Sequence, residues 1–185
     1  MEEISKDLIE KAGKIMLLLT DCDGVLTDGC IYYSKAGEEM KRFSMRDGMG
    51  AERLKKLVNV ETGIITGENS EIVRRRVEKL RIIEYHPGSA DKYFTLKEIL
   101  RRRKIGADQV AYIGDDTNDL EIMKNVGLCA CPSDALPIVK EIAHIVMKSR
   151  GGSGAFREFA EIIINFKNKH NEQKQKSAGW ESHYW

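Results

Sequence analysis

The sequence is poor in cysteine, in net charge and in long apolar runs, and each shortage excludes a class of protein. Its four cysteines stand at irregular spacing among 185 residues, which is too few for a disulfide framework. With 30 basic and 29 acidic residues, the formal net charge is +1, so no strong field favours a nucleic acid or an anionic membrane. No apolar run approaches the roughly 20 residues of a membrane span. We therefore expect a cytoplasmic protein that binds neither nucleic acid nor membrane.

Other features of the composition support this expectation. Residues 1–14 carry too many charges for a secretory signal. Cys129 and Cys131 lie in the apolar run 126–132 without a CxxC pattern or a histidine partner, so we expect small core residues rather than metal ligands. The length and the hydrophobic content of 42% suit one globular domain with a buried core.

What the sequence contains is a regular alternation of strand-like and helix-like segments. Strands are expected at 15–20, 61–66, 82–85, 109–113, 127–131 and 144–147. Helices are expected at 4–13, 47–57, 70–80, 91–104, 120–125, 137–142 and 154–166, the second of them with Asp47 as its N-cap. Repeated strand–helix units predict an α/β fold with a doubly wound, Rossmann-like parallel sheet and right-handed crossovers.

Two segments fall outside this alternation. Residues 30–34 and 39–45 flank a glycine-containing turn and predict an inserted β-hairpin. Residues 167–185 form a polar tail that ends in aromatic residues, so we expect one domain over 1–166 followed by a mobile tail. Docking of Trp180, Tyr184 and Trp185 onto a neighbouring surface is the alternative.

Two carboxylates follow directly after the first expected strand. The stretch DCDGVLTD at 21–28 places Asp21 and Asp23 at the strand's carboxyl end, where Gly24 allows a sharp turn. Ligands bind at the carboxyl ends of strands in open parallel sheets, and two neighbouring acids favour a cation between them. A surface turn is the competing interpretation, because Asp and Gly are common turn residues.

Three further strand ends carry polar groups of a complementary kind. Thr66 and Gly67 offer a hydroxyl and backbone N–H groups that suit a phosphate. Lys92 opens a helix, where a cation opposes the helix dipole and is better explained by an anion. The run GDDTND at 114–119 adds carboxylates. Taken singly, Thr66 reads equally well as a helix cap, Lys92 as a solvated lysine, and Asp119 as a first-turn acid.

Together these groups fit phosphoryl transfer through a carboxylate nucleophile. Asp21 would attack phosphorus, and Asp23 would protonate the leaving alkoxide and then activate water. Thr66 and Lys92 would bind the phosphoryl oxygens, and Asp115 would complete a metal site. Ligation by oxygen without cysteine favours Mg²⁺ over zinc.

The strand-end stretches DCDGVLTD, ITG, Lys92 and GDDTND resemble the four motifs of haloacid dehalogenase superfamily phosphatases, in the same order. The resemblance spans residues 15 to about 160. It implies that Asp21, the backbone carbonyl of Asp23 and Asp115 are metal ligands. It also implies that Asp116 and Asp119 are supporting acids that orient metal-bound water or Lys92.

Spacing indicates which branch of the family the chain resembles. The segments between Asp28 and Thr66 and between Thr66 and Lys92 are too short for a cap domain. The hairpin, MRDG at 45–48 and the glycine-rich segment 150–158 look like the capless branch, although a flexible loop is an equal interpretation of the last. That branch contains 3-deoxy-D-manno-octulosonate 8-phosphate phosphatases and nonulosonate (KDN or sialic acid) 9-phosphate phosphatases. The resemblance implies a homotetramer whose neighbouring subunits help to close each site.

One helix is expected to decide the substrate. At ~100° per residue, Glu68, Arg76 and Lys79 fall on one side of it, where the two cations would bind a carboxylate and Glu68 would bind hydroxyls. The octulosonate enzymes usually have arginine in place of Glu68, so we expect a nonulosonate 9-phosphate, with octulosonate 8-phosphate as the alternative. An exposed face of helical ion pairs is the competing interpretation.

Two interpretations without metabolic turnover remain. A two-component receiver domain also clusters Asp, Thr and Lys on a doubly wound sheet, but its acidic pair and phosphorylated Asp lie on different strands. A regulatory or oligomerisation module of sugar-nucleotide synthesis would be expected to lose the acid or the metal aspartate. Because Asp21, Asp23 and Asp115 are all present, a phosphatase is the better prediction.

Overall fold

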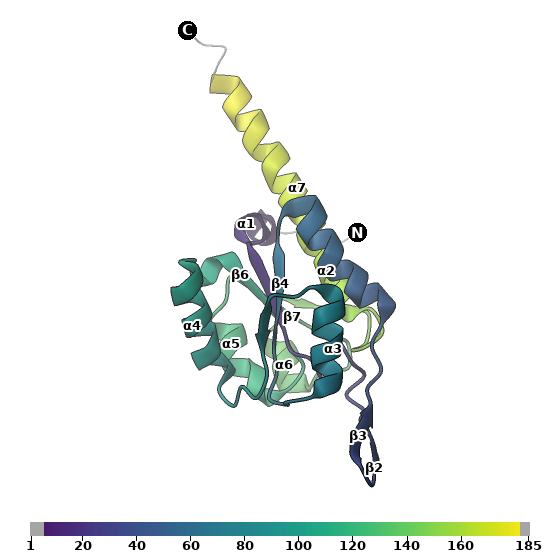
Figure 1. Ribbon diagram of the computed structural model, residues 1–185. Helices are drawn as coiled ribbons and strands as arrows, with labels where there is room; N and C mark the ends of the chain where they lie inside the picture. Colours follow the sequence, from purple (N-terminus) through teal and green to yellow (C-terminus); the bar gives the residue numbers. More distant parts are fainter. Residues whose placement is uncertain (1–5, 182–185) are drawn as a thin grey trace.

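A computed structural model describes residues 6–181, in which six parallel strands form one sheet with helices on both of its faces (Figure 1). The sheet runs in the order β5-β4-β1-β6-β7-β8. Its strands are β1 (Leu17–Thr20), β4 (Glu61–Ile65), β5 (Glu84–His86), β6 (Val110–Ile113), β7 (Leu128–Cys131) and β8 (Ile145–Val146). The predicted doubly wound α/β fold is therefore confirmed.

The helices divide between the two faces of the sheet. One face is covered by α1 (Lys6–Lys14), α2 (Met45–Val58), α3 (Glu71–Leu80) and α7 (Ala155–Glu181). The other is covered by α4 (Lys92–Arg103), α5 (Leu120–Lys124) and α6 (Pro137–Ile142). Two 3₁₀ turns, η1 (Ala107–Gln109) and η2 (Thr117–Asp119), flank β6.

Strand β1 lies in the middle of the sheet and contributes side chains to the hydrophobic cores on both of its faces. Leu17 and Leu19 pack into the core beneath α4 and α5, whereas Leu18 packs into the core beneath α2 and α7. All three side chains are fully buried, each contributing roughly 1.5–3 kcal/mol. A strand covered on both faces needs apolar residues at consecutive positions, which explains the unbroken apolar run in the sequence. Cys129 and Cys131 of β7 are buried core residues, as predicted. The expectation that no histidine accompanies them is wrong for Cys129, whose Sγ lies 2.9 Å from His144 Nδ1.

The predicted hairpin is present as β2 (Tyr32–Ser34) and β3 (Gly37–Met40), an antiparallel pair separate from the main sheet. It projects from the body of the protein near the carboxyl edge of the sheet (Figure 1), and Tyr32, Tyr33 and Met40 are exposed on it. Only this hairpin and α2 lie between β1 and β4, and only α3 lies between β4 and β5. The described chain therefore has no cap domain at either position.

The start of α2 differs from the prediction. Ser44, not Asp47, is the N-cap, and its hydroxyl accepts a hydrogen bond from Arg46 N at 3.1 Å. Asp47 is buried, and its carboxylate accepts from Gly154 N at 3.3 Å and Arg157 N at 2.9 Å. The carboxylate thus satisfies N–H groups at the start of α7, which sequence spacing does not reveal because the two segments are far apart in the chain.

The last helix is longer than predicted. It continues past Phe166 to Glu181, because Lys, Glu and Gln are good helix formers even without a core to pack against. Lys167 anchors the first part of this extension by donating to the carbonyls of Gly13 at 2.8 Å and Ile15 at 2.7 Å. The domain boundary at residue 166 stays a prediction, and the side chains of the aromatic tail lie outside the described residues.

None of the helices described is both long and apolar enough to cross a membrane.

Candidate active site

The loop after β1 is fixed at the middle of the sheet's carboxyl edge. Asp21 is buried, and its backbone N–H donates to Ile113 O at 3.0 Å, which ties the end of β1 to β6. Gly24 has a φ of +86°, and a Cβ built there would lie 2.0 Å from Asp115 Oδ2. Glycine is therefore needed both for the turn and for the close approach of this loop to Asp115.

Lys92 joins two of the predicted acids. It is the first residue of α4, after the N-cap Asp91, and only 3% of its surface is exposed. Its Nζ lies 2.9 Å from Asp21 Oδ1 and 2.6 Å from Asp119 Oδ1. Burial alone would lower the pKa of Lys92, but the two carboxylates outweigh it and raise the pKa above its usual value. The interpretation of Lys92 as a solvated lysine is wrong.

Asp119 organises this edge through both of its carboxylate oxygens. Oδ1 accepts from Lys92 Nζ and from the Tyr112 hydroxyl, each at 2.6 Å. Oδ2 accepts from the backbone N–H groups of Asp115 at 2.9 Å and Asp116 at 3.3 Å. Asp119 therefore holds Lys92 and fixes the loop that precedes it after β6, which carries Asp115. Sequence reasoning missed Tyr112, because an aromatic residue inside an apolar strand reads as part of the core.

Asp115 carries an oxygen that nothing in the described chain satisfies. Its Oδ1 is buried and has no hydrogen-bond partner. Burial, followed by the charges of Asp21 and Asp119, raises the pKa of Asp115 to about 8. Burial and the charge of Asp119 likewise raise the pKa of Asp21 to about 6 against the opposing effect of Lys92.

This arrangement fits a divalent cation. One oxygen each of Asp21, Asp115 and Asp119 lie within 4.8 Å of one another. Hard cations prefer such carboxylate oxygens and would offset their mutual repulsion. Because Asp119 is already engaged by four donors, Asp21 and Asp115 are the better candidates for ligands.

Thr66 stands at the same edge, after β4. Its backbone N–H donates to His86 O at 3.0 Å, and its hydroxyl accepts from Glu68 N at 3.2 Å. Within residues 6–181 the Thr66 hydroxyl donates to no protein acceptor, so its hydrogen can bind a phosphoryl oxygen. Ser70 caps α3, so Thr66 is not the helix cap. Gly67 is exposed beside it.

Asp23 has a partner that the sequence did not suggest. Lys41 Nζ lies 2.9 Å from its Oδ1 and 2.7 Å from its Oδ2, and the Thr27 hydroxyl donates to Oδ1 at 3.1 Å. Lys41 directly follows β3, and its side chain is fully buried. No local signal marks it, because a lysine in an exposed hairpin is expected to be solvated.

Asp116 contributes its backbone N–H to the acidic group, by donating to Asp119 Oδ2, whereas its carboxylate has other partners. It is exposed, and its Oδ1 accepts from the backbone N–H and the hydroxyl of Thr117, at 2.5 Å and 3.1 Å. Its contacts cap η2 and include neither Lys92 nor Asp21. The structure therefore does not bring Asp116 to Lys92.

The glycine-rich segment supports the loop after β1. Gly152 has a φ of +60°, and its N–H donates to Val25 O at 2.9 Å. A Cβ built on Gly151 would lie 1.9 Å from Gly24 O. The segment is thus packed directly against the loop that carries Asp21 and Asp23, which the interpretation as a loose surface loop does not predict.

The three residues expected to bind the sugar acid do not form one cluster. Glu68 is exposed just before α3. Arg76 donates to Ser44 O at 3.0 Å, and its guanidinium lies 5.6 Å from the centre of the Phe43 ring. Lys79 lies in the last turn of α3, a helix of 10 residues that is about 15 Å long.

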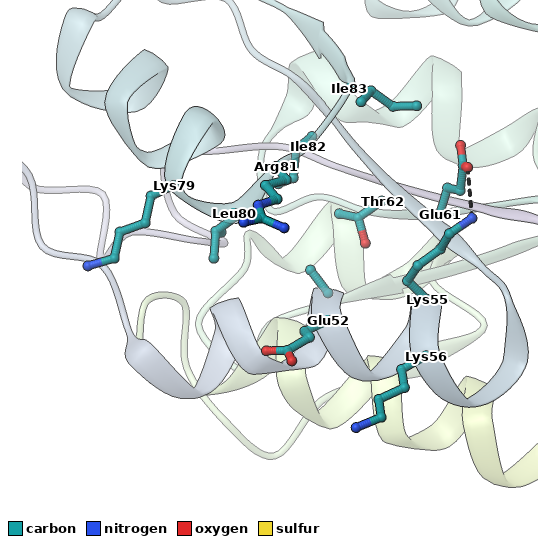
Figure 2. A pocket seen from close by; sticks show the side chains of 11 residues that line it. Glu52, Lys55, Lys56, Glu61, Thr62, Lys79, Leu80, Arg81, Ile82 and Ile83 are labelled. Carbon is teal, nitrogen blue, oxygen red and sulfur yellow. Dashed lines mark hydrogen bonds and ion pairs between the residues drawn. The ribbon is translucent and has the colours of Figure 1, made fainter.

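Lys79 instead lines a cavity of about 640 Å³ at the opposite, amino edge of the sheet, together with Thr62 and Arg81 (Figure 2). The structure therefore does not bring Lys79 to the active edge of its own subunit, and the substrate-binding role of Glu68, Arg76 and Lys79 stays a prediction. A projection down the helix axis shows which residues share a side, but it ignores the rise of 1.5 Å per residue.

These strand-end motifs, the sheet and the lack of a cap define a class of enzyme. The chain belongs to the haloacid dehalogenase-like hydrolases, whose family model matches residues 51–159. It is 38% identical over 174 residues to the 3-deoxy-D-manno-octulosonate 8-phosphate phosphatase KdsC of Escherichia coli (strain K12), covering 94% of this chain and 92% of that protein. The chain is a phosphoric monoester hydrolase, and the prediction of an enzyme is confirmed.

Solved structures agree with this assignment. The crystal structure of 3-deoxy-D-manno-octulosonate 8-phosphate phosphatase from Yersinia pestis superposes with a TM-score of 0.85 at 38% identity, covering 91% of this chain and 90% of that one. The enzyme from Moraxella catarrhalis, solved with magnesium, phosphate and KDO, gives a TM-score of 0.85 at 31% identity, covering 94% and 99%. The relatives carry the octulosonate name, so they support that alternative better than the expected nonulosonate preference.

Proposed function

We propose that this enzyme hydrolyses 3-deoxy-D-manno-octulosonate 8-phosphate. The observation that carries the proposal is the buried group of Asp21, Lys92 and Asp119 beside the partnerless oxygen of Asp115. It supplies a nucleophile, a fixed cation for phosphoryl oxygens and room for a metal at one edge of the sheet. The octulosonate substrate is supported by relatives that match the chain over nine-tenths of its length.

The residues would act in two half-reactions. An Asp21 oxygen attacks phosphorus, the bond from phosphorus to the sugar oxygen breaks, and Asp23 gives its proton to that oxygen. Asp23 then takes a proton from the water that attacks the aspartyl phosphate, which releases inorganic phosphate and restores Asp21. Lys92 and the Thr66 hydroxyl would donate to the phosphoryl oxygens throughout.

Mg²⁺ is the proposed cofactor. Asp21, Asp115 and the backbone carbonyl of Asp23 would hold it, and the ion would draw charge away from the phosphoryl oxygens. The buried Oδ1 of Asp115 supports this assignment. So does the magnesium in the Moraxella catarrhalis relative.

A nonulosonate 9-phosphate is the second candidate. One observation favours it: Glu68, exposed two residues after Thr66, stands where the octulosonate enzymes usually have arginine. A carboxylate there would repel an acidic sugar but accept hydrogen bonds from its hydroxyls. Arg76 and Lys79 give this candidate less support than the sequence suggested, since neither lies free beside Glu68.

The enzyme is also proposed to be a homotetramer in which neighbours cover each open site. The exposed Tyr32, Tyr33 and Met40 of the hairpin support this, because an isolated two-stranded ribbon with an apolar surface gains stability from a partner. Light scattering of the active enzyme measures the assembly. A fully active monomer would contradict the proposal.

The decisive experiment measures phosphate release from both sugar acid phosphates with Mg²⁺. We expect the larger kcat/KM for the eight-carbon substrate. A larger value for the nine-carbon substrate would select the second candidate, and then Glu68→Arg should shift the preference back. If neither compound is hydrolysed, the proposed substrate class is wrong.

A further inference from the structure

Asp23 is held by a buried lysine from the hairpin, outside the four motifs. Both Asp23 oxygens lie within 2.9 Å of Lys41 Nζ. The Lys41 side chain is fully buried, whereas that of Asp23 is 24% exposed. A lysine is seldom buried without a specific partner, because desolvating an ammonium is costly. The ion pair between Lys41 and Asp23 is therefore a mostly buried part of the carboxyl edge rather than a solvent-exposed contact.

The two oxygens of Asp23 differ in their surroundings. Oδ1 accepts from both Lys41 Nζ and the Thr27 hydroxyl, and that hydroxyl in turn accepts from the backbone N–H of Gly29 at 3.2 Å. Among the residues that the structure describes, Lys41 alone donates to Oδ2, at 2.7 Å. When the carboxyl group carries a proton, Oδ2 is the oxygen with a lone pair available for it, and Oδ1 can keep both of its donors.

Lys41 also links Asp23 to other parts of the active edge. Its Nζ lies 3.3 Å from Glu38 Oε1 in β3, and Glu38 Oε2 accepts from the Ser70 hydroxyl at 2.5 Å. Ser70 is the N-cap of α3, the helix that follows Thr66 and Glu68. The base of the hairpin is thus joined by hydrogen bonds to the proposed acid–base group and to the start of α3.

We propose that Lys41 is a positioning residue that holds the Asp23 carboxyl group in the orientation needed to protonate the leaving sugar oxygen. This inference rests on the proposed function, in which the bond from phosphorus to the sugar oxygen breaks as the Asp23 proton moves to that oxygen. Because its side chain is fully buried against Asp23 and Glu38, Lys41 would act through Asp23 rather than on the substrate. The position of the hairpin thereby determines how the Asp23 carboxyl group is oriented for proton transfer.

The test compares two leaving groups. An alkoxide from a sugar needs a proton as it departs, whereas the 4-nitrophenolate of 4-nitrophenyl phosphate leaves without one. For both compounds kcat/KM covers only the steps up to departure of the leaving group, so the later hydrolysis of the aspartyl phosphate does not enter. We expect Lys41→Met to lower kcat/KM about 100-fold for the sugar acid phosphate and less than about fivefold for the aryl phosphate.

Three further variants serve as controls for the comparison of the two leaving groups. Asp23→Asn should show the same selective loss, and Lys41→Arg should recover most of it, because a guanidinium can contact both carboxylate oxygens. Lys169→Met removes an exposed lysine of α7, far from the hairpin in sequence, and should leave both kcat/KM values unchanged. A structural role for Lys41 would lower both values equally, and that result would overturn the inference.

The outcomes also separate this inference from the proposed function. If the wild type hydrolyses neither phosphate, the proposed function fails and the inference fails with it. If Asp23→Asn is selectively impaired but Lys41→Met is not, only the positioning role is wrong. A crystal structure of Lys41→Met provides a readout besides activity: the Asp23 side chain should adopt another rotamer, and an unmoved carboxylate would contradict the inference.

Discussion

Carboxylates lie at both ends of the sheet, and the two sites differ in charge balance. At the carboxyl edge, Asp21 and Asp119 share one ammonium, that of Lys92, and Asp115 adds a third carboxylate beside them. At the start of β5, Glu84 alone contacts two guanidinium groups, those of Arg102 and Arg103, and the ring of His86. The first group has an excess of negative charge, and the second has an excess of donors.

The pKa values follow this balance. The pKa of Asp115 is raised to about 8 by burial and by the neighbouring acids. Burial alone would also raise the pKa of Glu84, but hydrogen bonds from His86, Arg103 and Arg102 lower it to about 2. Both side chains are carboxylates shielded from water, so the neighbours decide the direction. We infer that the Glu84 group stabilises the fold, whereas the acidic group costs stability and serves the chemistry.

The largest expected effect is on catalysis at the carboxyl edge. Asp21→Asn should lower phosphate release by about 10⁴-fold or more, since an amide cannot form the aspartyl phosphate. Its free energy of unfolding should change little, because removing one of three crowded carboxylates offsets the lost contact with Lys92. Activity assays and urea unfolding of the same preparation measure both. Retention of full activity would show that Asp21 is not the nucleophile.

The second largest effect is expected on the stability of the fold, at Glu84. Glu84→Gln should lower the free energy of unfolding by about 3 kcal/mol, because it removes the buried carboxylate that contacts both arginines, although Arg103 keeps Glu61 Oε2 at 2.8 Å. Specific activity per folded molecule should be unchanged. Glu98→Gln is the matched control, since its exposed ion pair with Arg101 should contribute less than about 1 kcal/mol. Equal losses of unfolding free energy in Glu84→Gln and Glu98→Gln would contradict the stabilising role inferred for Glu84.

In metal-free protein, the effect of Asp115→Asn on the free energy of unfolding should be opposite to that of Glu84→Gln. Removing the negative charge of Asp115 from its place beside Asp21 and Asp119 should raise the free energy of unfolding by about 1–3 kcal/mol in the presence of a chelator. Mg²⁺ should stabilise the wild type against heat through preferential binding to the folded state, but it should stabilise the variant little. Calorimetry with and without Mg²⁺ measures this. A variant stabilised by Mg²⁺ as strongly as the wild type would exclude Asp115 as a ligand.

The smallest expected effect is the pH dependence, and its sign differs between the clusters. The folded-state pKa of Glu84 lies at about 2, below the usual 4.5, so its stabilisation is fully present above pH 4.5 and disappears as the pH falls through 2. The difference in unfolding free energy between wild type and Glu84→Gln should shrink by about 1 kcal/mol between pH 7 and 4.

Asp115 should behave in the reverse way in metal-free protein. Its folded-state pKa is about 8, above the usual 3.8, so its destabilising effect is absent below pH 3.8, grows between pH 3.8 and 8, and is complete above pH 8. The stability gained by Asp115→Asn should therefore increase with pH. Denaturant unfolding across this range checks both trends, and parallel pH profiles for the two variants would contradict the comparison.

Much of the site could be predicted from the sequence because its parts follow strands directly. Asp21, Thr66 and Asp115 each come one or two residues after a buried strand, and parallel strands bring their carboxyl ends to one edge. Groups that approach through space gave no such signal. Tyr112 reads as core, Lys41 as a solvated hairpin lysine, and Asp47 as a cap for its own helix rather than for α7.

The sequence by itself determined the α/β alternation, the hairpin, the lack of a cap and the strand-end residues, because periodicity and spacing are local properties of the chain. Only the tertiary structure decided which charges share partners. It joins Lys92 to both Asp21 and Asp119, places Lys41 on Asp23, and puts Lys79 at the far edge of the sheet. Burial and through-space electrostatics depend on distances between segments remote in sequence, and folding alone sets those distances.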